Sequence, residues 1–406
     1  MDTCAVRHDG VVTPTRRRTG SGLAAIAAGM GMVELAMSTR ADDWLTYPQI
    51  GAMGSVYALA LIIGVAAAPL AARVGSRVAI TVGALSAYIP LALIGLLVSA
   101  GSSAVVPVAL ALWALGGAGA GVMDMAHLAQ ATMFARARRL DTMMLFGVRQ
   151  AGAVAMGGIA AWAIERGVPV AAQYVSAGLI LTAVTLAALG AVPPLTEEAL
   201  RRPEAGAEAG RGALVALGAL AAAGVMPTMG AYYWARPIMS EVYSGSAWAG
   251  GGVLAWTCAQ VIVPMACWQV SDRVDARRIA RGAALVAATG VALLVPVALH
   301  ARAPYLAPGM VYAALLSALA MIGGGIAVVP AMCHQAAARV RAPLGLVGRI
   351  TAVVGTQCVL TAAASYGLGH AAEAWGSLPA FMTVCVVCVA GVTVGSGLLR
   401  HARPIA

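Results

Sequence analysis

Charged side chains are scarce in this sequence. Only 10% of its 406 residues are charged, whereas 61% are hydrophobic. With a mean hydropathy of +0.85, too little polar surface remains to face water around a soluble fold. Lysine is absent and all 26 basic residues are arginine, a bias that by itself carries no chemistry. The composition excludes an ordinary soluble globular protein and favours a chain embedded in lipid.

A disulfide framework is also missing. The seven cysteines lie mostly inside apolar segments, where they act as small hydrophobic residues, at positions 4, 258, 267, 333, 358, 385 and 388. Cys385 and Cys388 form a C-x-x-C pair, but no second pair or nearby histidine completes a metal site. We expect these cysteines to serve packing, and we expect no metal.

Motifs for nucleotides, catalysis and nucleic acids are lacking too. The run from Gly117 to Gly121 follows no strand and lies inside a hydrophobic segment, so it predicts a notch for helix packing. No P-loop occurs, and no histidine, aspartate or nucleophile motif clusters at a membrane face. The net charge of +10 is spread in small groups rather than along one polar face. We therefore expect no cofactor, no enzymatic turnover and no nucleic-acid partner.

Long apolar runs dominate what is present. A helix needs about twenty apolar residues to cross the hydrocarbon layer, and twelve such runs occur between polar breaks. They are residues 22–40, 49–70, 78–98, 104–126, 143–163, 169–191, 212–235, 247–269, 279–299, 307–331, 347–367 and 378–398. The sequence predicts an all-α integral membrane protein with twelve transmembrane helices.

The arginines orient these spans. If the loops alternate between two sides, twenty arginines fall on one side and only Arg40, Arg166, Arg236 and Arg302 on the other. Since basic residues accumulate in cytoplasmic loops, both termini are predicted to be cytoplasmic. The predicted regions are a tail (1–20), a six-helix bundle (21–192), a polar cytoplasmic linker (193–211), a second six-helix bundle (212–400) and a tail (401–406).

The two bundles resemble copies of each other. Arg73 and Arg273 both follow the second span of their half, and Arg149 and Arg349 are also 200 residues apart. Gly116-Gly117 followed by His127 matches Gly323-Gly324 followed by His334, with the same spacing of eleven. Together these matches favour a duplication of six spans, a common plan among transporters.

With this topology the chain resembles the major facilitator superfamily. The family's loop signature, G-x-x-x-D-R-x-G-R-[RK], is similar to residues 68–77, where Arg73, Gly75 and Arg77 match but Ala68 and Ala72 do not. A second copy keeps Asp272 and Arg273 and loses both glycines. The resemblance implies two six-helix halves related by a pseudo-twofold axis. It also implies that these loop residues gate conformational changes; the alternative is that Arg73 and Arg77 are only positive-inside anchors.

Three charged residues lie within the predicted spans. A charge at the bilayer centre costs about 2.5–3.5 kcal/mol on insertion scales, so such residues need interior partners. Glu34 is a candidate for proton coupling or substrate binding, against a structural hydrogen bond or an early helix end. Asp124 and Arg149 face each other in depth and are predicted to form an ion pair, structural or substrate-binding. His127 could join a proton relay or simply reach the interface.

The seventh span gathers further candidates near its outer end. Pro227 and Gly230 predict a helix break there, and discontinuous helices often hold ligands in transporters. Three aromatic residues and a cation follow, namely Tyr232, Tyr233, Trp234 and Arg236. The alternative is an aromatic belt at the headgroups with Arg236 snorkelling. Tyr57 and Gln357 are weaker pocket candidates.

These features lead to one main expectation. The chain is expected to be a monomeric secondary transporter in the cell (inner or plasma) membrane that moves a small organic solute by alternating access, coupled to protons and directed towards export. One alternative is an uptake symporter for a small organic acid or sugar. Another is a receptor or assembly protein of the same fold that has lost transport. Its partners would be the solute, protons and membrane lipid.

Overall fold

The computed structural model describes residues 14–38, 40–67, 74–101, 105–138, 142–189, 210–242, 251–270, 273–340, 344 and 346–401. Within these ranges the chain folds into twelve α-helices, which confirms the predicted all-α class. Ten of the described helices are long and apolar enough to cross a membrane. The chain is therefore a multi-pass integral membrane protein. Most of the predicted linker and C-terminal tail lies outside the described residues, whereas α1 begins at Pro14, within the predicted N-terminal tail.

Each predicted span coincides with one helix. The helices are α1 (Pro14–Ser38), α2 (Tyr47–Ala66), α4 (Ser76–Ala100), α5 (Val105–Arg138), α6 (Thr142–Glu165), α7 (Val170–Ala188), α8 (Arg211–Val242), α9 (Gly251–Val270), α10 (Ala276–Arg302), α11 (Pro308–Arg339), α12 (Leu346–Trp375) and α13 (Ser377–Gly395). The ten candidate spans are α2, α4, α5 and α7 to α13, so the further spans, α1 and α6, stay a prediction.

Some helices run well past the predicted ends. The expected fourth span stops at residue 126, whereas α5 continues to Arg138, and α12 continues to Trp375. Hydropathy marks only the apolar part of a helix, and alanine, methionine and arginine sustain the helix beyond it. As a result Asp124 lies in the body of α5 rather than near its end.

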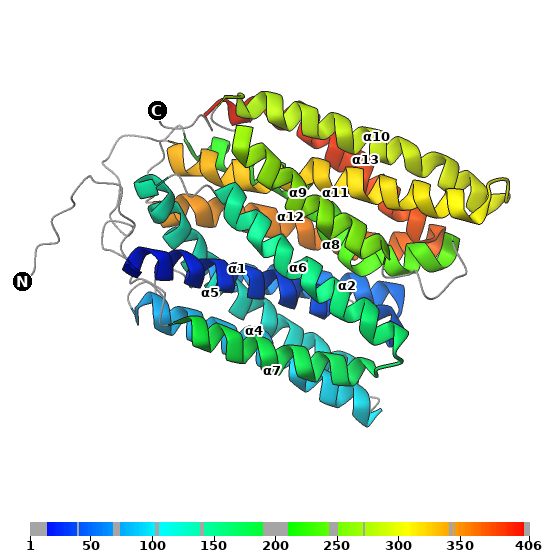
Figure 1. Cartoon of the computed structure of the whole chain (residues 1–406), viewed down its shortest axis with the longest axis horizontal. Helices are drawn as coiled ribbons and strands as arrows, with labels where there is room; N and C mark the ends of the chain where they lie inside the picture. The colour runs from blue at the N-terminus through cyan, green and yellow to red at the C-terminus, as the bar shows by residue number, and fades with distance from the viewer. Residues whose placement is uncertain are drawn as a thin grey trace, which may run out of the picture.

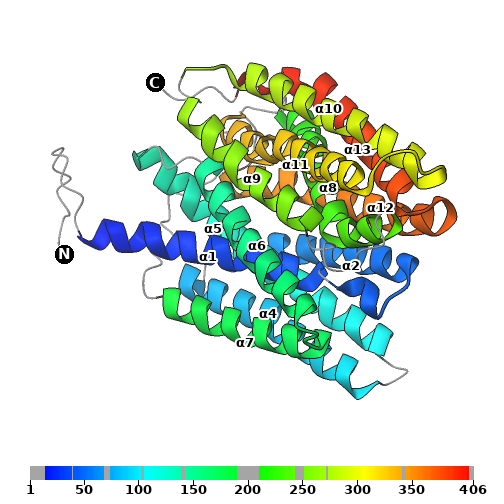
Figure 2. The same cartoon turned by 45° about the vertical axis from the view of Figure 1, so that its right-hand side comes forward.

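The helices lie side by side along the long axis of the molecule (Figure 1). Helices α1, α2 and α4 to α7 gather in the lower part of the view and α8 to α13 in the upper part, and the grouping persists after a turn of 45° (Figure 2). Helix α2 packs along α12, and α6 packs along α9. These two contacts join the lower and the upper group.

Glycines let the helices approach closely. A Cβ atom on Gly117 or Gly121 of α5 would collide with the carbonyl oxygen of Tyr57 or Leu61 on α2. A Cβ atom on Gly119 would lie 2.6 Å from the carbonyl oxygen of Gly83 on α4. The predicted notch is therefore confirmed, and it seats α5 between α2 and α4. Cys385 and Cys388 are buried in α13.

One end of the bundle carries a short 3-10 helix, η1 (Ala41–Asp43), between α1 and α2. The start of α2 and the end of α8 lie at the same end, because side chains from η1 and α2 bond to Arg236 and Glu241 of α8. We call this the η1 end of the bundle.

Candidate functional site

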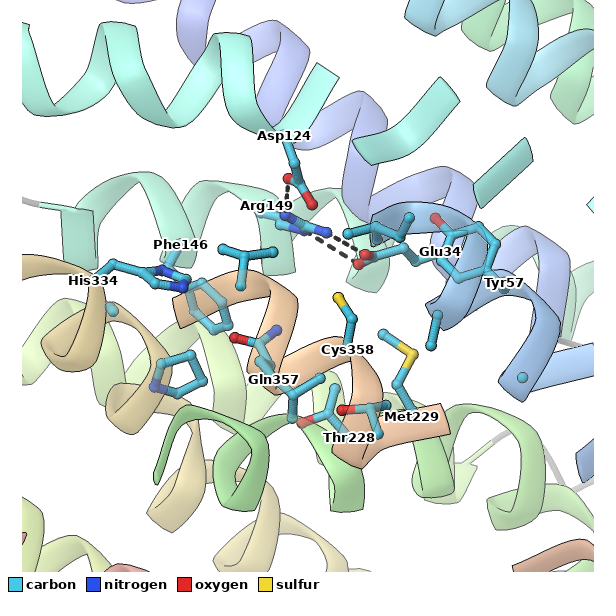
Figure 3. Close-up of a pocket in the computed structure, with 18 of the residues that line it drawn as sticks. Glu34, Tyr57, Asp124, Phe146, Arg149, Thr228, Met229, His334, Gln357 and Cys358 are labelled. Carbon is cyan, nitrogen blue, oxygen red and sulfur yellow. Dashed lines mark hydrogen bonds and ion pairs between the residues drawn. The ribbon is translucent and has the colours of Figure 1, made fainter. Parts of the chain in front are cut away.

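A large cavity lies among the helices, with about 1260 Å³ of empty space when its solvent-open part is included. Its lining comes from α1, α2, α5 and α6 of the lower group and from α8, α11 and α12 of the upper group. Figure 3 shows side chains from these helices pointing towards a common centre. Segments that lie more than 300 residues apart in the sequence therefore build one site.

Arg149 on α6 holds two carboxylates at once. Its Nε and Nη2 atoms donate to the two carboxylate oxygens of Glu34 on α1, with the Nε bond at 3.2 Å. Its Nη1 atom donates to Oδ1 of Asp124 on α5 at 2.6 Å. Figure 3 shows the guanidinium between the two acids. The predicted Asp124–Arg149 ion pair is thus confirmed, and Glu34 joins it as a third member that the sequence did not predict.

Two glycines bring Glu34 within reach of Arg149. A Cβ atom on Gly31 of α1 would collide with the carbonyl oxygen of Arg149, and one on Gly152 of α6 would collide with the carbonyl oxygen of Ala28. Because only glycine allows this backbone contact, α1 and α6 touch one turn away from the ion pair. Helix α1 also continues to Ser38, so Glu34 does not mark an early helix end.

Burial differs among the three charged groups. The side chain of Glu34 is 6% exposed, whereas those of Arg149 and Asp124 are each 20% exposed. A buried charge is tolerated only when its partners satisfy it. Glu34 is therefore the deeply held member, and Asp124 and Arg149 are the members that the cavity can reach.

The opposite wall of the cavity is polar but neutral. It presents Thr228 of α8 together with Gln357 and Thr361 of α12. The hydroxyls of Thr361 and of Tyr57 on α2 are buried and have no hydrogen-bond partner among the described residues. Buried polar atoms of this kind are usually satisfied, so these two hydroxyls are free to bond to a molecule in the cavity.

The aromatic residues of α8 face the interior of the protein. Tyr232, Tyr233 and Trp234 are at most 7% exposed, which argues against an aromatic belt in contact with lipid headgroups. Tyr233 lines the cavity, and the Tyr232 hydroxyl donates to Oε1 of Gln150 at 2.7 Å. Trp234 packs edge-on against Tyr47, with 5.1 Å between ring centroids.

The helix break predicted at Pro227 does not occur, because α8 is continuous from Arg211 to Val242. Proline removes one backbone donor and strains the preceding turn. Here the hydroxyl of Thr228 donates to the carbonyl oxygen of Gly224 at 3.3 Å. This bond does not serve the carbonyl of Ala223, which is the one that Pro227 leaves without its helical donor; neighbouring helices and small local adjustments let a membrane helix accommodate proline without breaking.

Arg236 takes no part in the cavity and lies at the η1 end. Its Nη1 atom donates to Oδ1 of Asp42 at 2.9 Å and to Oδ1 of Asp43 at 2.6 Å. Burial raises the pKa of the Asp42 carboxyl, although the guanidinium of Arg236 opposes this effect. Arg236 therefore joins the end of α8 to the loop between α1 and α2, and does not snorkel alone.

Several other predicted residues lie elsewhere. Arg73 and Asp272 lie outside the described residues, as does the side chain of His127, so their roles stay predictions. Gly75 directly precedes α4 with a φ of 104°, a conformation that favours glycine. Arg77 and Arg273 are exposed at the starts of α4 and α10. The three described residues of this group, Gly75, Arg77 and Arg273, do not line the cavity.

Some lining residues were not predicted from the sequence. His334 on α11, Phe146 and Gln150 on α6, and Cys358 on α12 all line the cavity. His334 had appeared only as the repeat counterpart of His127, and Gln150 directly follows Arg149. A polar residue next to an intramembrane charge, or one helical turn away from it, is the sequence signal that could have indicated such lining residues. Arg349, the counterpart of Arg149, instead donates to the carbonyl oxygen of Val340 at 2.5 Å.

Comparisons with known proteins place the chain in no family. No protein-family model matches it, and no curated protein matches it in sequence. The geometry of the cavity therefore carries the functional interpretation.

Proposed function

We propose that this protein is a secondary active transporter that moves a small organic solute across the cell membrane by alternating access, coupled to protons. The observation that carries the proposal is the cavity itself. A buried carboxylate–guanidinium–carboxylate cluster faces neutral polar groups from helices distant in sequence. Charged groups inside a membrane bundle usually mark solute or proton pathways.

The helix contacts support two six-helix halves of the major facilitator type. The six helices of the first group can be matched in chain order with the six of the second group. Helix α1 contacts α6 and α7, and its counterpart α8 contacts α12 and α13. In the same way α5 contacts α2 and α4 where α11 contacts α9 and α10, and α4 contacts α7 where α10 contacts α13. Of the contacts between the groups, α2–α12 is the counterpart of α9–α6 in this matching. A pseudo-twofold axis through the cavity would relate the halves and allow them to rock about it.

The contacts at the η1 end support one state of alternating access, the state that is closed to the outside. In the proposed topology both termini are cytoplasmic, so the η1 end is the outer one. There Arg236 of α8 bonds to Asp42 and Asp43, and the Tyr47 hydroxyl of α2 lies 3.4 Å from Glu241 of α8. These bonds cross between the proposed halves, so the structure fits a form that is closed to the outside.

Reconstitution in liposomes tests the proposal. Flux of a panel of organic cations, anions and neutral solutes should be measured with and without a pH gradient. We expect at least one solute to move faster with the gradient, and Glu34→Gln to abolish that stimulation. The matched control is Glu373→Gln, because Glu373 is exposed at the end of α12. If no solute moves, the transport proposal fails, and solute binding without flux would favour a receptor.

Full gradient-driven flux in Glu34→Gln would leave transport intact but remove Glu34 from proton coupling. The lean to export is tested in the same vesicles, by comparing an inward with an outward proton gradient. In our proposal protons enter the cell as the solute leaves. Stimulation only when both move in the same direction would instead favour the uptake symporter.

A further inference from the structure

We infer that the cavity recognises an amphipathic organic monocation, which binds Asp124 with its charged end and the neutral wall with its other end. The inference rests on the proposed transport function, because it names the class of solute that this same cavity carries. It follows from the charge balance, the bonding of Arg149 and the character of the opposite wall.

The cluster of Glu34, Asp124 and Arg149 contains more negative than positive groups. Glu34 and Asp124 bring two carboxylates, whereas Arg149 is the only guanidinium that lines the cavity among the described residues. An uncompensated charge in a membrane interior is costly, so the cluster favours one additional positive charge. Asp124 is the acceptor for it, because its carboxylate is 20% exposed and only its Oδ1 atom is used in the ion pair.

The same geometry disfavours an anionic solute. Arg149 already donates through Nε and Nη2 to Glu34 and through Nη1 to Asp124. These bonds use three of the five N–H groups of the guanidinium, so a carboxylate or phosphate on the solute would have to lie beside the carboxylates of Glu34 and Asp124 to reach the others. The repulsion between these like charges disfavours an anionic solute.

The rest of the cavity suits the remainder of such a molecule. Phe146, Met229 and Tyr233 also line the cavity, and aromatic faces attract organic cations. The unpartnered hydroxyl of Thr361 on the opposite wall and that of Tyr57, which lies beside Glu34 (Figure 3), provide donors and acceptors for polar groups of the solute. A cation with a hydrophobic body matches both kinds of surface.

A proton competes with this cation for the same excess charge. The titratable groups around the cluster are Glu34 on α1, Tyr57 on α2, Tyr88 on α4, Asp124 on α5, Arg149 on α6, Tyr232 and Tyr233 on α8, His334 on α11 and Cys358 on α12. Acid neutralises a carboxylate of the cluster, whereas alkali restores its charge. Affinity for the cation should therefore increase as the pH rises, and such competition is what exchange of solute for protons requires.

Two probes of nearly equal size and shape but opposite charge test the inference directly. Binding of tetraphenylphosphonium and of tetraphenylborate to the purified full-length protein should be measured by titration calorimetry at about pH 8, where an ordinary histidine is neutral. We expect the cation to bind at least about tenfold more tightly than the anion, a difference of about 1.4 kcal/mol. Equal affinities, or tighter binding of the anion, would overturn the inference.

Two variants locate the contact. Asp124→Asn removes the excess charge and should weaken binding of the cation by at least about tenfold, while Glu373→Gln serves as the matched control. Since Asp124→Asn could also disturb folding, its thermal unfolding is measured alongside, and Asp124→Glu should restore binding. Loss of affinity in Asp124→Asn without rescue by Asp124→Glu would contradict the proposed contact, as would unchanged affinity in Asp124→Asn.

The two proposals fail in different ways. If tetraphenylphosphonium binds selectively but no solute crosses liposomes, the transport function is wrong and the ligand class stands. If a pH gradient drives the flux of anions or neutral solutes only, the transport function stands and the ligand class is wrong.

Discussion

The guanidinium of Arg236 bonds to the carboxylates of both Asp42 and Asp43, at 2.9 and 2.6 Å. The two acids lie in η1, within the loop between α1 and α2, whereas Arg236 lies in the last turns of α8, more than 190 residues later. Each partner is only partly buried, with 21–24% of its side chain exposed. Ion pairs that are this exposed are weak enough to break and form again, as opening and closing of the η1 end requires.

Removing this cation should release the η1 end. Arg236→Gln loses two partly exposed ion pairs, each worth roughly 1 kcal/mol or less, so the open population should rise about fivefold. Spin labels at Thr46→Cys and Ser240→Cys, both exposed at this end, report the separation by pulsed electron resonance. Arg302→Gln, also exposed, is the control. An unchanged distance distribution in Arg236→Gln would show that the pair does not hold the closure.

Acid should favour the closed η1 end through Asp42. Burial in the closed form raises the pKa of this carboxyl above its ordinary value, to which it returns when the end opens to water. Between the two values the closed form binds a proton that the open form releases. Lowering the pH through this window therefore favours closure, and raising it favours opening. The same spin labels measure the effect, and Asp42→Asn should remove this contribution.

Loss of Arg149 should be more harmful than loss of either acid. Arg149→Gln leaves Glu34 and Asp124 side by side without their cation, and we expect a loss of about 3 kcal/mol in the free energy of unfolding. Adding Glu34→Gln should recover part of that loss, because one orphaned charge disappears. Thermal unfolding in detergent measures both changes, with exposed Arg278→Gln as control. A double variant less stable than Arg149→Gln would contradict the charge argument.

Packing between α1 and α6 should control the ion pair. A Cβ atom at Gly152 collides with the backbone of α1, whereas one at Gly158 on the same helix meets nothing within 4 Å. Gly152→Ala should therefore destabilise the protein by about 1–3 kcal/mol. It should also weaken tetraphenylphosphonium binding, because it separates Glu34 from Arg149. Gly158→Ala is the matched control, neutral or slightly stabilising; equal effects of the two would exclude the packing argument.

Some of the site could be predicted because its signals are local. A charge inside an apolar run is visible in the sequence, so Glu34, Asp124 and Arg149 were identifiable, and antiparallel neighbours place the last two at similar depth. The partner of Glu34 was not predictable, because it depends on how α1 is rotated about its axis. The partners of Arg236 were not predicted, because they lie in the loop between α1 and α2, far from Arg236 in the sequence.

The sequence by itself determined which segments become helices, that they lie in a membrane, and that a few buried charges need partners. These properties can be predicted because the length and the summed hydropathy of a single segment decide whether it inserts in a membrane. Only the tertiary structure decided which charges meet, that α8 stays continuous through Pro227, and that Tyr233 faces a cavity. These outcomes depend on helix rotation and on backbone contacts such as Gly31 against Arg149, which segments distant in the chain set together.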